Sequence, residues 1–248
     1  FGKVGAAALL ALGKVADSTE GSPALSARAI AALQWLVSML KELRPREITV
    51  KREPPLLLFV DGAYEESPSG PVATVGAVLF DPTRPQDGPR YFGQAVGQSL
   101  VSWWSRGEKN QLIGQAELLP VLLAKHTWSD VFKNRRCFVF IDNNSARYVL
   151  VNGYSPVLDS GQIISDVWLF DSIQGVSSWY ARVPTDSNIA DGPSRLFVKL
   201  VDAYANATRC RIQLLQEWGE GEVWDTLTAR WARNVTQMLW GNPGPIDA

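Results

Sequence analysis

Two short stretches decide the fold, residues 56–62 (LLLFVDG) and residues 137–144 (CFVFIDNN). Each begins as a continuous apolar run, which predicts a strand buried on both faces of a sheet. Each run ends in an aspartate, Asp61 or Asp142. In an open α/β sheet the reactive crevice lies outside the carboxyl ends of the strands. If the two strands are parallel neighbours, their carboxylates are expected to lie side by side in that crevice.

Paired carboxylates at this position suggest a metal site. Like charges a few ångströms apart are unfavourable unless a cation neutralises them or one acid is protonated. Ligands that are all oxygen suit Mg²⁺ or Mn²⁺. The alternative is that Asp61 and Asp142 only form turns, since Asp-Gly and Asp-Asn are common turn dipeptides.

The rest of the central region predicts a mixed α/β domain. Turn-rich residues separate the second and third strands, which favours an antiparallel meander, and residues 65–71 read as a polar loop. A helix and a parallel crossover follow the meander. Strands are expected at 56–60, 72–80, 91–96, 137–141 and 177–183, and helices at 115–128, 145–151, 162–174 and from about residue 190.

Both flanks are expected to be helical. Apolar residues between Ala27 and Leu43 recur at spacings of three and four, and the pair Pro54-Pro55 marks a boundary. We therefore divide the chain into a connecting segment (1–53), a main domain (54–200) and a C-terminal extension (201–248). The start at Phe1 suggests a piece of a longer chain, and residues 1–15 fit an internal amphipathic helix better than a targeting peptide.

Composition narrows the chemistry. The 248 residues include 24 Lys and Arg, 25 Asp and Glu, one His and two Cys. Cys137 and Cys210 lack the spacing of a zinc finger or a disulfide framework, and a single histidine excludes mechanisms that need two. Catalysis by Asp and Glu carboxylates is the main option that remains. No stretch is long enough to span a membrane, and two free thiols favour an intracellular setting, whether nuclear, cytoplasmic or organellar.

Two further acids complete a recognisable set. Glu117 stands in GQAELLPV, and Asp191 stands in VPTDSNIADGPSR. Together with FVDGAYE and VFIDNNSAR, these motifs resemble the ribonuclease H family, and in particular the ribonuclease H domain that follows reverse transcriptases in retroelements. The resemblance covers about residues 56–200. It implies a ribonuclease H-like α/β fold with a five-stranded mixed sheet, a three-strand antiparallel meander plus parallel strands, flanked by helices.

The resemblance also implies an activity, the metal-dependent hydrolysis of the RNA strand of an RNA–DNA hybrid. By that analogy two Mg²⁺ ions, or Mn²⁺, are held by Asp61, Glu117, Asp142 and Asp191. Asp61 would bridge both ions, Glu117 and Asp142 would hold the ion near the leaving group, and Asp191 the ion near the attacking water. Two ions about 3.5–4 Å apart can activate water and stabilise the leaving oxygen.

The chain departs from the family pattern in two places. The loop 184–188 has no histidine, although many relatives carry one there, and His126 is expected to be an ordinary structural or surface residue. Pro120 is expected to be tolerated only if its helix begins close to Glu117, because proline fits the first turn and disrupts the interior.

Expected substrate contacts surround the acids. Gly62 would let a backbone approach the phosphates, or be a turn glycine. Residues at the head of the following helix would donate to phosphate or to the 2′-OH of RNA, or simply cap the helix. The full set of proposed contacts is Gly62, Asn143, Asn144, Ser145, Arg147 and Asn188.

Two other features have competing interpretations. Trp103 and Trp104 could stack on a duplex or belong to the core. The basic run from Lys133 to Arg136 is a candidate for contacting phosphates, or a solvated turn.

Three functions remain open from the sequence. The first is ribonuclease H activity on a hybrid or a structured RNA. The second is a domesticated ribonuclease H-like fold that serves as a structural or RNA-contacting subunit, and the third is a related nuclease acting on DNA junctions or single strands. The terminal extensions could join the domain to a larger polyprotein or multi-subunit assembly.

Overall fold

The computed structural model describes residues 53–68, 70–105 and 112–212, together with isolated positions before residue 41. Apart from those positions, the helix expected over 27–43 lies outside the described residues, as does the extension after residue 212. No helix within the described part of the chain is long and apolar enough to cross a membrane.

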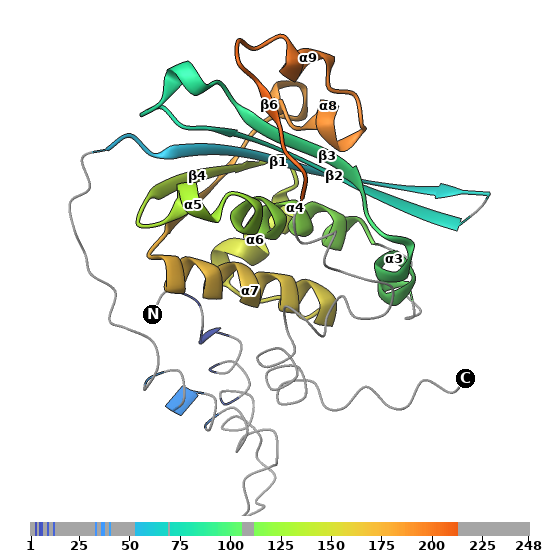
Figure 1. The fold of residues 1–248 in the computed structure, drawn as a ribbon. Coiled ribbons are helices and arrows are strands. Elements are labelled where there is room, and N and C mark those ends of the chain that lie inside the picture. The colour runs from blue at the N-terminus through green and yellow to red at the C-terminus, as the bar shows by residue number, and fades with distance from the viewer. Residues whose placement is uncertain are drawn as a thin grey trace, which may run out of the picture.

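A mixed sheet forms the centre of the domain (Figure 1). The first three strands form the expected antiparallel meander, and the next two run parallel to the first. The strand order among the described residues is β5-β4-β1-β2-β3-β6. The strands are β1 (Leu56–Ser67), β2 (Gly70–Phe80), β3 (Arg90–Ala95), β4 (Arg136–Ile141), β5 (Ser177–Arg182) and β6 (Thr208–Arg209). This is the ribonuclease H-like topology that the motifs imply, with one short strand added at the edge.

Helices lie on both faces of the sheet (Figure 1). The larger layer contains α4, α6 and α7, and α8 packs on the opposite face against β1, β2 and β3. The helices are α3 (Gln98–Trp104), α4 (Ile113–Thr127), α5 (Ser129–Phe132), α6 (Asn144–Asn152), α7 (Leu158–Gln174), α8 (Asp191–Ser194) and α9 (Lys199–Asp202); η1 (Pro85–Asp87) and η2 (Thr185–Ser187) are single 3₁₀ turns.

The main core lies between the sheet and α4. Strand alternation directs Leu56, Leu58 and Val60 of β1 to this side, where all three are fully buried. Helix α4 is buried along residues 115–125 because it lies between the sheet and α7. A helix that is apolar on every side is typical of such a position.

Strand β1 is longer than the sequence suggested. It continues past Asp61 to Ser67, and residues 65–71 form the tip of a hairpin with β2 instead of a loop. Cross-strand pairing of Glu65 with Val72 outweighs the low strand propensity of these residues. Asp61 therefore lies inside a strand, and the interpretation of its Asp-Gly pair as a turn is wrong.

The expectation for Pro120 is also wrong, because α4 begins at Ile113 and Pro120 lies inside the helix. A proline at this position cannot donate to the carbonyl of Ala116. Strand β1 passes close to this carbonyl: a Cβ added to Gly62 would lie 2.0 Å from it. Gly62 is therefore required for the contact between β1 and α4.

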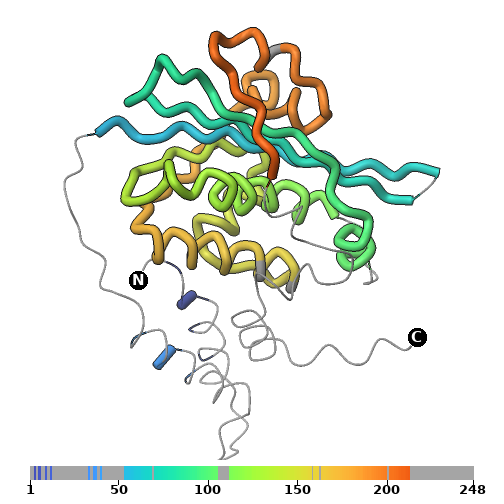
Figure 2. Tube along the Cα trace, in the orientation of Figure 1, coloured from blue at the N-terminus to red at the C-terminus, as the bar shows by residue number. Residues whose placement is uncertain are grey.

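The C-terminal boundary of the domain lies beyond residue 200. Figure 2 follows the chain from α9 back to the sheet, where β6 pairs with β3 through Arg90 and Thr208. Ile212 is fully buried in the main core. A two-residue strand is too short to produce an alternating pattern, which explains why the sequence suggested only helix here.

The structure decides between the competing interpretations of the two tryptophans. Trp104 is buried, and Trp103 packs on the core and donates from Nε1 to Asp159 over 3.3 Å, so both belong to the interior. Both tryptophans lie on α3, where the sequence did not predict a helix. Cys137 and Cys210 are both free thiols.

Candidate metal centre

Three acids meet at the carboxyl end of the parallel strands. The register pairs Leu56 with Cys137 and continues to Phe59 with Phe140, so its extension by two residues places Asp61 beside Asp142. Glu117 approaches from the first half of α4. One carboxylate oxygen from each of the three acids lies within 4.8 Å of the others. The predicted side-by-side position of Asp61 and Asp142 is confirmed, and Glu117 joins them as the family resemblance implies.

The acids repel one another in a poorly solvated site. Asp61 is 5% exposed and Glu117 is 6% exposed. Burial, followed by the charges of Asp61 and Asp142, raises the pKa of Glu117 from 4.5 to about 8. Burial also raises the pKa of Asp61 from 3.8 to about 6, although a hydrogen bond from Ser194 opposes this increase. Without a cation, Glu117 therefore keeps its proton at neutral pH.

The donor set fits a divalent cation. Oε2 of Glu117 and Oδ1 of Asp142 are buried and accept no hydrogen bond from the described residues. Two oxygens on opposite sides of one Mg²⁺ lie about 4.2 Å apart, so the 4.8 Å limit is close to what one ion requires. Buried carboxylate oxygens without donors are the ligands that a hard cation prefers.

Asp191 lies beside this cluster but outside the group of three. It begins α8, its charge contributes to the raised pKa of Asp61, and Nε of Arg195 pairs with its Oδ1 at 2.9 Å. The prediction that four acids converge is therefore met by three. Pairing with Arg195 supplies the positive charge for Asp191 that a second cation would supply.

Ser194 connects the two sides of the site, and sequence reasoning missed it. Its fully buried hydroxyl contacts a carboxylate oxygen of Asp61 and lies 2.9 Å from the backbone carbonyl of Asp191. The spacing in the sequence could have indicated this contact. Ser194 and Arg195 follow Asp191 by three and four residues, and residues at these spacings lie on one side of a helix. Both residues belong to the motif that contains Asp191.

Two glycines hold α8 against the sheet. A Cβ on Gly76 of β2 would lie 2.3 Å from the backbone nitrogen of Ser194, and a Cβ on Gly93 of β3 would lie 2.2 Å from the carbonyl oxygen of Pro193. These approaches leave no space for a side chain. The absence of side chains at both positions thus fixes the distance between α8 and Asp61.

The head of α6 borders the cluster. Asn143 is the N-cap, and its Oδ1 accepts from the backbone of Ala146 at 3.0 Å, so the capping alternative is confirmed for this residue. Hydrogen bonding from the Asn143 side chain also offsets part of the increase in the pKa of Glu117. Asn144 and Ser145 are exposed in the first turn, and Nε of Arg147 is buried with no partner among the described residues.

Asn188 supports β1 from the other side. Its buried side chain donates to the carbonyl of Val60 at 3.0 Å and accepts from the backbone of Ala190 at 3.3 Å. Its amide therefore holds the backbone next to Asp61 instead of pointing to a substrate. Gly62 is likewise buried beneath α4, so it serves packing instead of phosphate contact or a turn.

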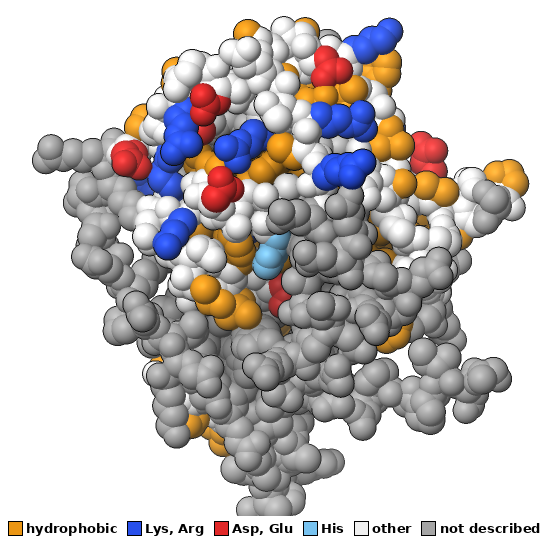
Figure 3. Space-filling model, in the orientation of Figure 1, with side chains coloured by type: hydrophobic (Ala, Val, Ile, Leu, Met, Phe, Trp, Pro, Cys, Tyr) orange, Lys and Arg blue, Asp and Glu red, His pale blue; other side chains and the backbone are white. Residues whose placement is uncertain are grey.

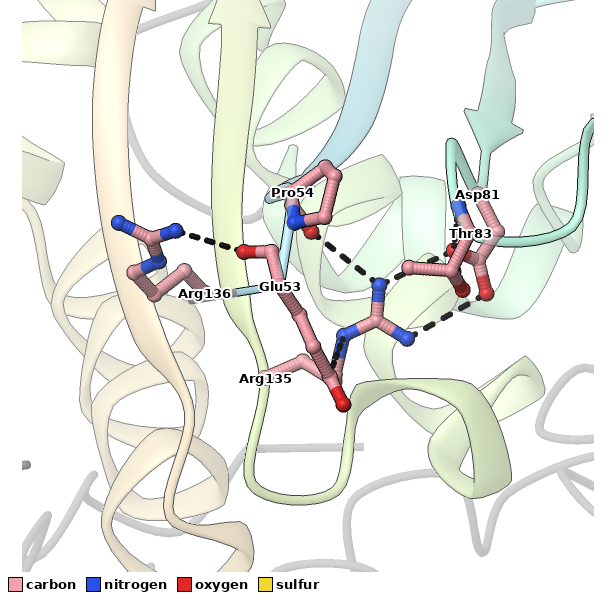
Figure 4. Close-up of polar contacts among 6 residues, drawn as sticks. All are labelled: Glu53, Pro54, Asp81, Thr83, Arg135 and Arg136. Atoms are coloured by element: carbon pink, nitrogen blue, oxygen red, sulfur yellow. Dashed lines mark hydrogen bonds and ion pairs between the residues drawn. The ribbon is translucent and has the colours of Figure 1, made fainter. Parts of the chain in front are cut away.

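The basic run 133–136 lies at the opposite end of the sheet. Figure 4 shows the Arg135 guanidinium pairing with Asp81 at 3.0 Å and with Glu53 at 3.4 Å, while Arg136 donates to the carbonyl of Glu53. Arg136 begins β4 and Asp142 follows its end, so about 20 Å separates them along the strand. Arg135 therefore joins strand ends and does not contact a phosphate at the acids.

His126 takes no part in the site. It lies at the C-terminal end of α4, lines a cleft of about 260 Å³ with Asp166 and Phe170, and is visible on the helical side of the molecule (Figure 3). Its ring meets Phe170 edge-on at 5.0 Å, and burial lowers its pKa to about 4. The structural interpretation of this histidine is confirmed.

No protein-family model and no curated protein sequence matches the chain. Several solved structures resemble it. The N-terminal RNase H domain of a Mycobacterium tuberculosis protein, solved as a fusion with maltose-binding protein, is 16% identical, with 59% of this chain and 95% of that chain covered and a TM-score of 0.43. RNase H1 from the halophilic archaeon Halobacterium salinarum is 22% identical, with 60% and 98% covered and a TM-score of 0.40.

A viral protein shows a similar degree of likeness. The protease-reverse transcriptase of prototype foamy virus is 13% identical, with 66% of this chain but only 22% of the viral chain covered and a TM-score of 0.40. The chain itself combines the strand order β5-β4-β1-β2-β3 with acids on β1, on α4 and after β4. It thus has the fold and the order of acids expected from its resemblance to the ribonuclease H family.

Proposed function

We propose that the chain is a metal-dependent endonuclease that hydrolyses the RNA strand of RNA–DNA hybrids. The observation that carries the proposal is the cluster of buried Asp61 and Glu117 with half-buried Asp142, in which two carboxylate oxygens have no donor among the described residues. Placing three carboxylates this close together, two of them buried, destabilises the fold unless their charge is compensated. A functional cation accounts for this cost.

Mg²⁺ is the cation that we assign, held by Asp61, Glu117 and Asp142, with Asp191 available for a second ion if Arg195 moves away. When bound, Mg²⁺ lowers the pKa of water and stabilises the charge on a leaving oxygen. The chain supplies the positioning: Ser194 fixes one oxygen of Asp61, and Asn143 interacts with Glu117. No nucleophilic side chain is required, in agreement with a chain that has one histidine and two cysteines.

Recognition of RNA is assigned to the head of α6. Asn144 and Ser145 are exposed shortly after Asp142, at the start of α6, and Arg147 follows them on the same helix with its guanidinium N–H donors. Their amide, hydroxyl and guanidinium groups suit phosphate oxygens and the 2′-OH, which distinguishes RNA from DNA. The resemblance to retroelement ribonuclease H domains makes the hybrid formed during reverse transcription the preferred substrate class.

A substrate comparison tests the proposal. The full chain is incubated with a hybrid labelled on its RNA strand, the same hybrid labelled on its DNA strand, single-stranded RNA, and duplex DNA, each with Mg²⁺, with Mn²⁺ and with a chelator. We expect cleavage of the RNA strand of the hybrid alone, and only with a divalent ion. Equal cutting of single-stranded RNA would remove the specificity claim, and cutting of duplex DNA would favour a DNA nuclease.

A further inference from the structure

The sheet face that bears Asp61 also bears a group of aromatic side chains. Register pairs Phe138 of β4 with Trp179 of β5, and Phe140 of β4 with Phe59 of β1. The rings of Phe59 and Phe140 are stacked at 4.6 Å. Paired residues point to the same face, and Phe59 packs against the small core beneath α8 and α9. The group therefore lies on the α8 side of the sheet.

The described helices cover only part of this face. Helix α8 packs on β1, β2 and β3 but not to a comparable extent on β4 or β5 among the described elements (Figure 1). Trp179 is 67% exposed and Phe138 is 40% exposed. Exposing a tryptophan next to a phenylalanine on a flat sheet is unfavourable without a partner, and clustered exposed aromatics mark binding sites. We call Phe138, Phe140 and Trp179 the aromatic platform.

The platform is continuous with the metal centre. Phe140 is two residues before Asp142 on β4, and Phe138 is four residues before it. A strand rises about 3.3 Å per residue, so Phe138 and its neighbour Trp179 lie about 13 Å from the acids along the strand direction. A chain that leaves the metal centre along this face meets Phe140 first and then the pair of Phe138 and Trp179.

A positive charge stands at the far end of the platform. Arg136 is exposed and two residues before Phe138, so it points to the same face. Its guanidinium donates to the backbone carbonyl of Glu53. This acceptor has no formal charge, so the hydrogen bond does not neutralise the positive charge of Arg136. Aromatic rings followed by an arginine match a polyanion that carries flat bases, whereas apolar rings alone would match a protein partner equally well.

We propose that the aromatic platform binds an unpaired, single-stranded segment of the RNA whose paired part lies at the metal centre, by stacking its bases on Trp179 and Phe138. This inference rests on the proposed function and extends it to the substrate class: a hybrid with a single-stranded RNA extension. Sheet-based RNA-binding domains stack bases on aromatic side chains of adjacent strands in the same manner. Base–aromatic stacking is tolerant of sequence, so no preferred sequence is expected.

Binding of two labelled probes to the full chain tests the proposal. One is a blunt hybrid, and the other is the same hybrid with a short single-stranded RNA extension, prepared at either the 5′ or the 3′ end. Asp142→Asn is present throughout to prevent cleavage. We expect one extension to strengthen binding by about tenfold. Trp179→Ala should abolish this gain and leave blunt-hybrid binding unchanged, while Trp179→Phe should retain most of it.

The matched control is Ile173→Ala on α7, because Ile173 is 65% exposed but lies on a helix of the opposite layer. It should retain the full gain. The proposal is overturned if neither extension strengthens binding or if Trp179→Ala keeps the gain. It is also overturned if Trp179→Ala leaves RNA binding intact but dissociates a dimer in sedimentation, since the face would then join two copies. If the blunt hybrid is not bound, or if the unmodified chain does not cut it with Mg²⁺, the proposed function itself is rejected instead.

Discussion

Replacing Glu117 by glutamine should stabilise the metal-free protein at neutral pH. The pKa of Glu117 is raised from 4.5 to about 8, first by burial and then by Asp61 and Asp142. The folded state therefore holds a proton that the unfolded state releases as the pH rises above 4.5. The stability that this proton contributes is fully present below pH 4.5 and is lost between pH 4.5 and 8. The interval from 4.5 to 7 corresponds to about 3 kcal/mol, at 1.4 kcal/mol per pH unit.

Urea denaturation with a chelator measures this effect. Glu117→Gln has no proton to lose, so at pH 7 it should exceed the native protein by up to about 3 kcal/mol, and at pH 4 the two should agree. Glu65→Gln on the exposed part of β1 is the control and should match the native protein at both pH values. Saturating Mg²⁺ should stabilise the native protein more than Glu117→Gln, because a ligand that binds only the folded state adds to its stability.

Two results would contradict this prediction. If Glu117→Gln lowers the stability of the chelated protein at pH 7, the carboxylate is compensated within the chain and needs no cation. The same holds if the stability of the native protein does not decline between pH 5 and 7.

Two further predictions concern how the acids are held in place. Gly62→Ala should destabilise the protein by about 3 kcal/mol or more in thermal unfolding, because its Cβ would lie 2.0 Å from the carbonyl of Ala116 on α4. The control is Gly114→Ala, also on α4, whose Cβ meets nothing within 4 Å and which should be neutral or slightly stabilising. Ser194→Ala removes the hydroxyl that contacts Asp61. It should raise the Mg²⁺ concentration needed for half-maximal cleavage by about tenfold, with little loss of rate at saturating Mg²⁺. An unchanged Mg²⁺ requirement would contradict a positioning role for Ser194.

The sequence predicted the meander, the parallel pair and the meeting of Asp61 with Asp142, because long apolar runs and strand-end acids are local signals. Glu117 was placed through the family resemblance, and the position of α4 against β1 confirms it. These are the parts of the site that regular structure alone determines.

Other parts depend on contacts between distant segments. The Asp-Gly pair at residue 61 resembles a turn, and only pairing with β2 keeps it in a strand. Pro120 is tolerated in the interior of α4 where Gly62 lets β1 approach. Asp191 is held by Arg195, a charge pair that no pattern of apolar residues predicts. Sequence periodicity carries no information about such pairings, since each depends on the assembled layers.

The most direct test of the metal centre is the rate of RNA-strand cleavage by Asp142→Asn relative to the unmodified chain, with saturating Mg²⁺ and a labelled hybrid. Asp130→Asn is the matched control, because Asp130 is an exposed aspartate on α5. If Asp61, Glu117 and Asp142 hold the catalytic ion, Asp142→Asn should reduce the rate by about 100-fold or more, and Asp130→Asn should leave it unchanged. Equal rates for Asp142→Asn and the unmodified chain would contradict the assignment of this cluster as the active site.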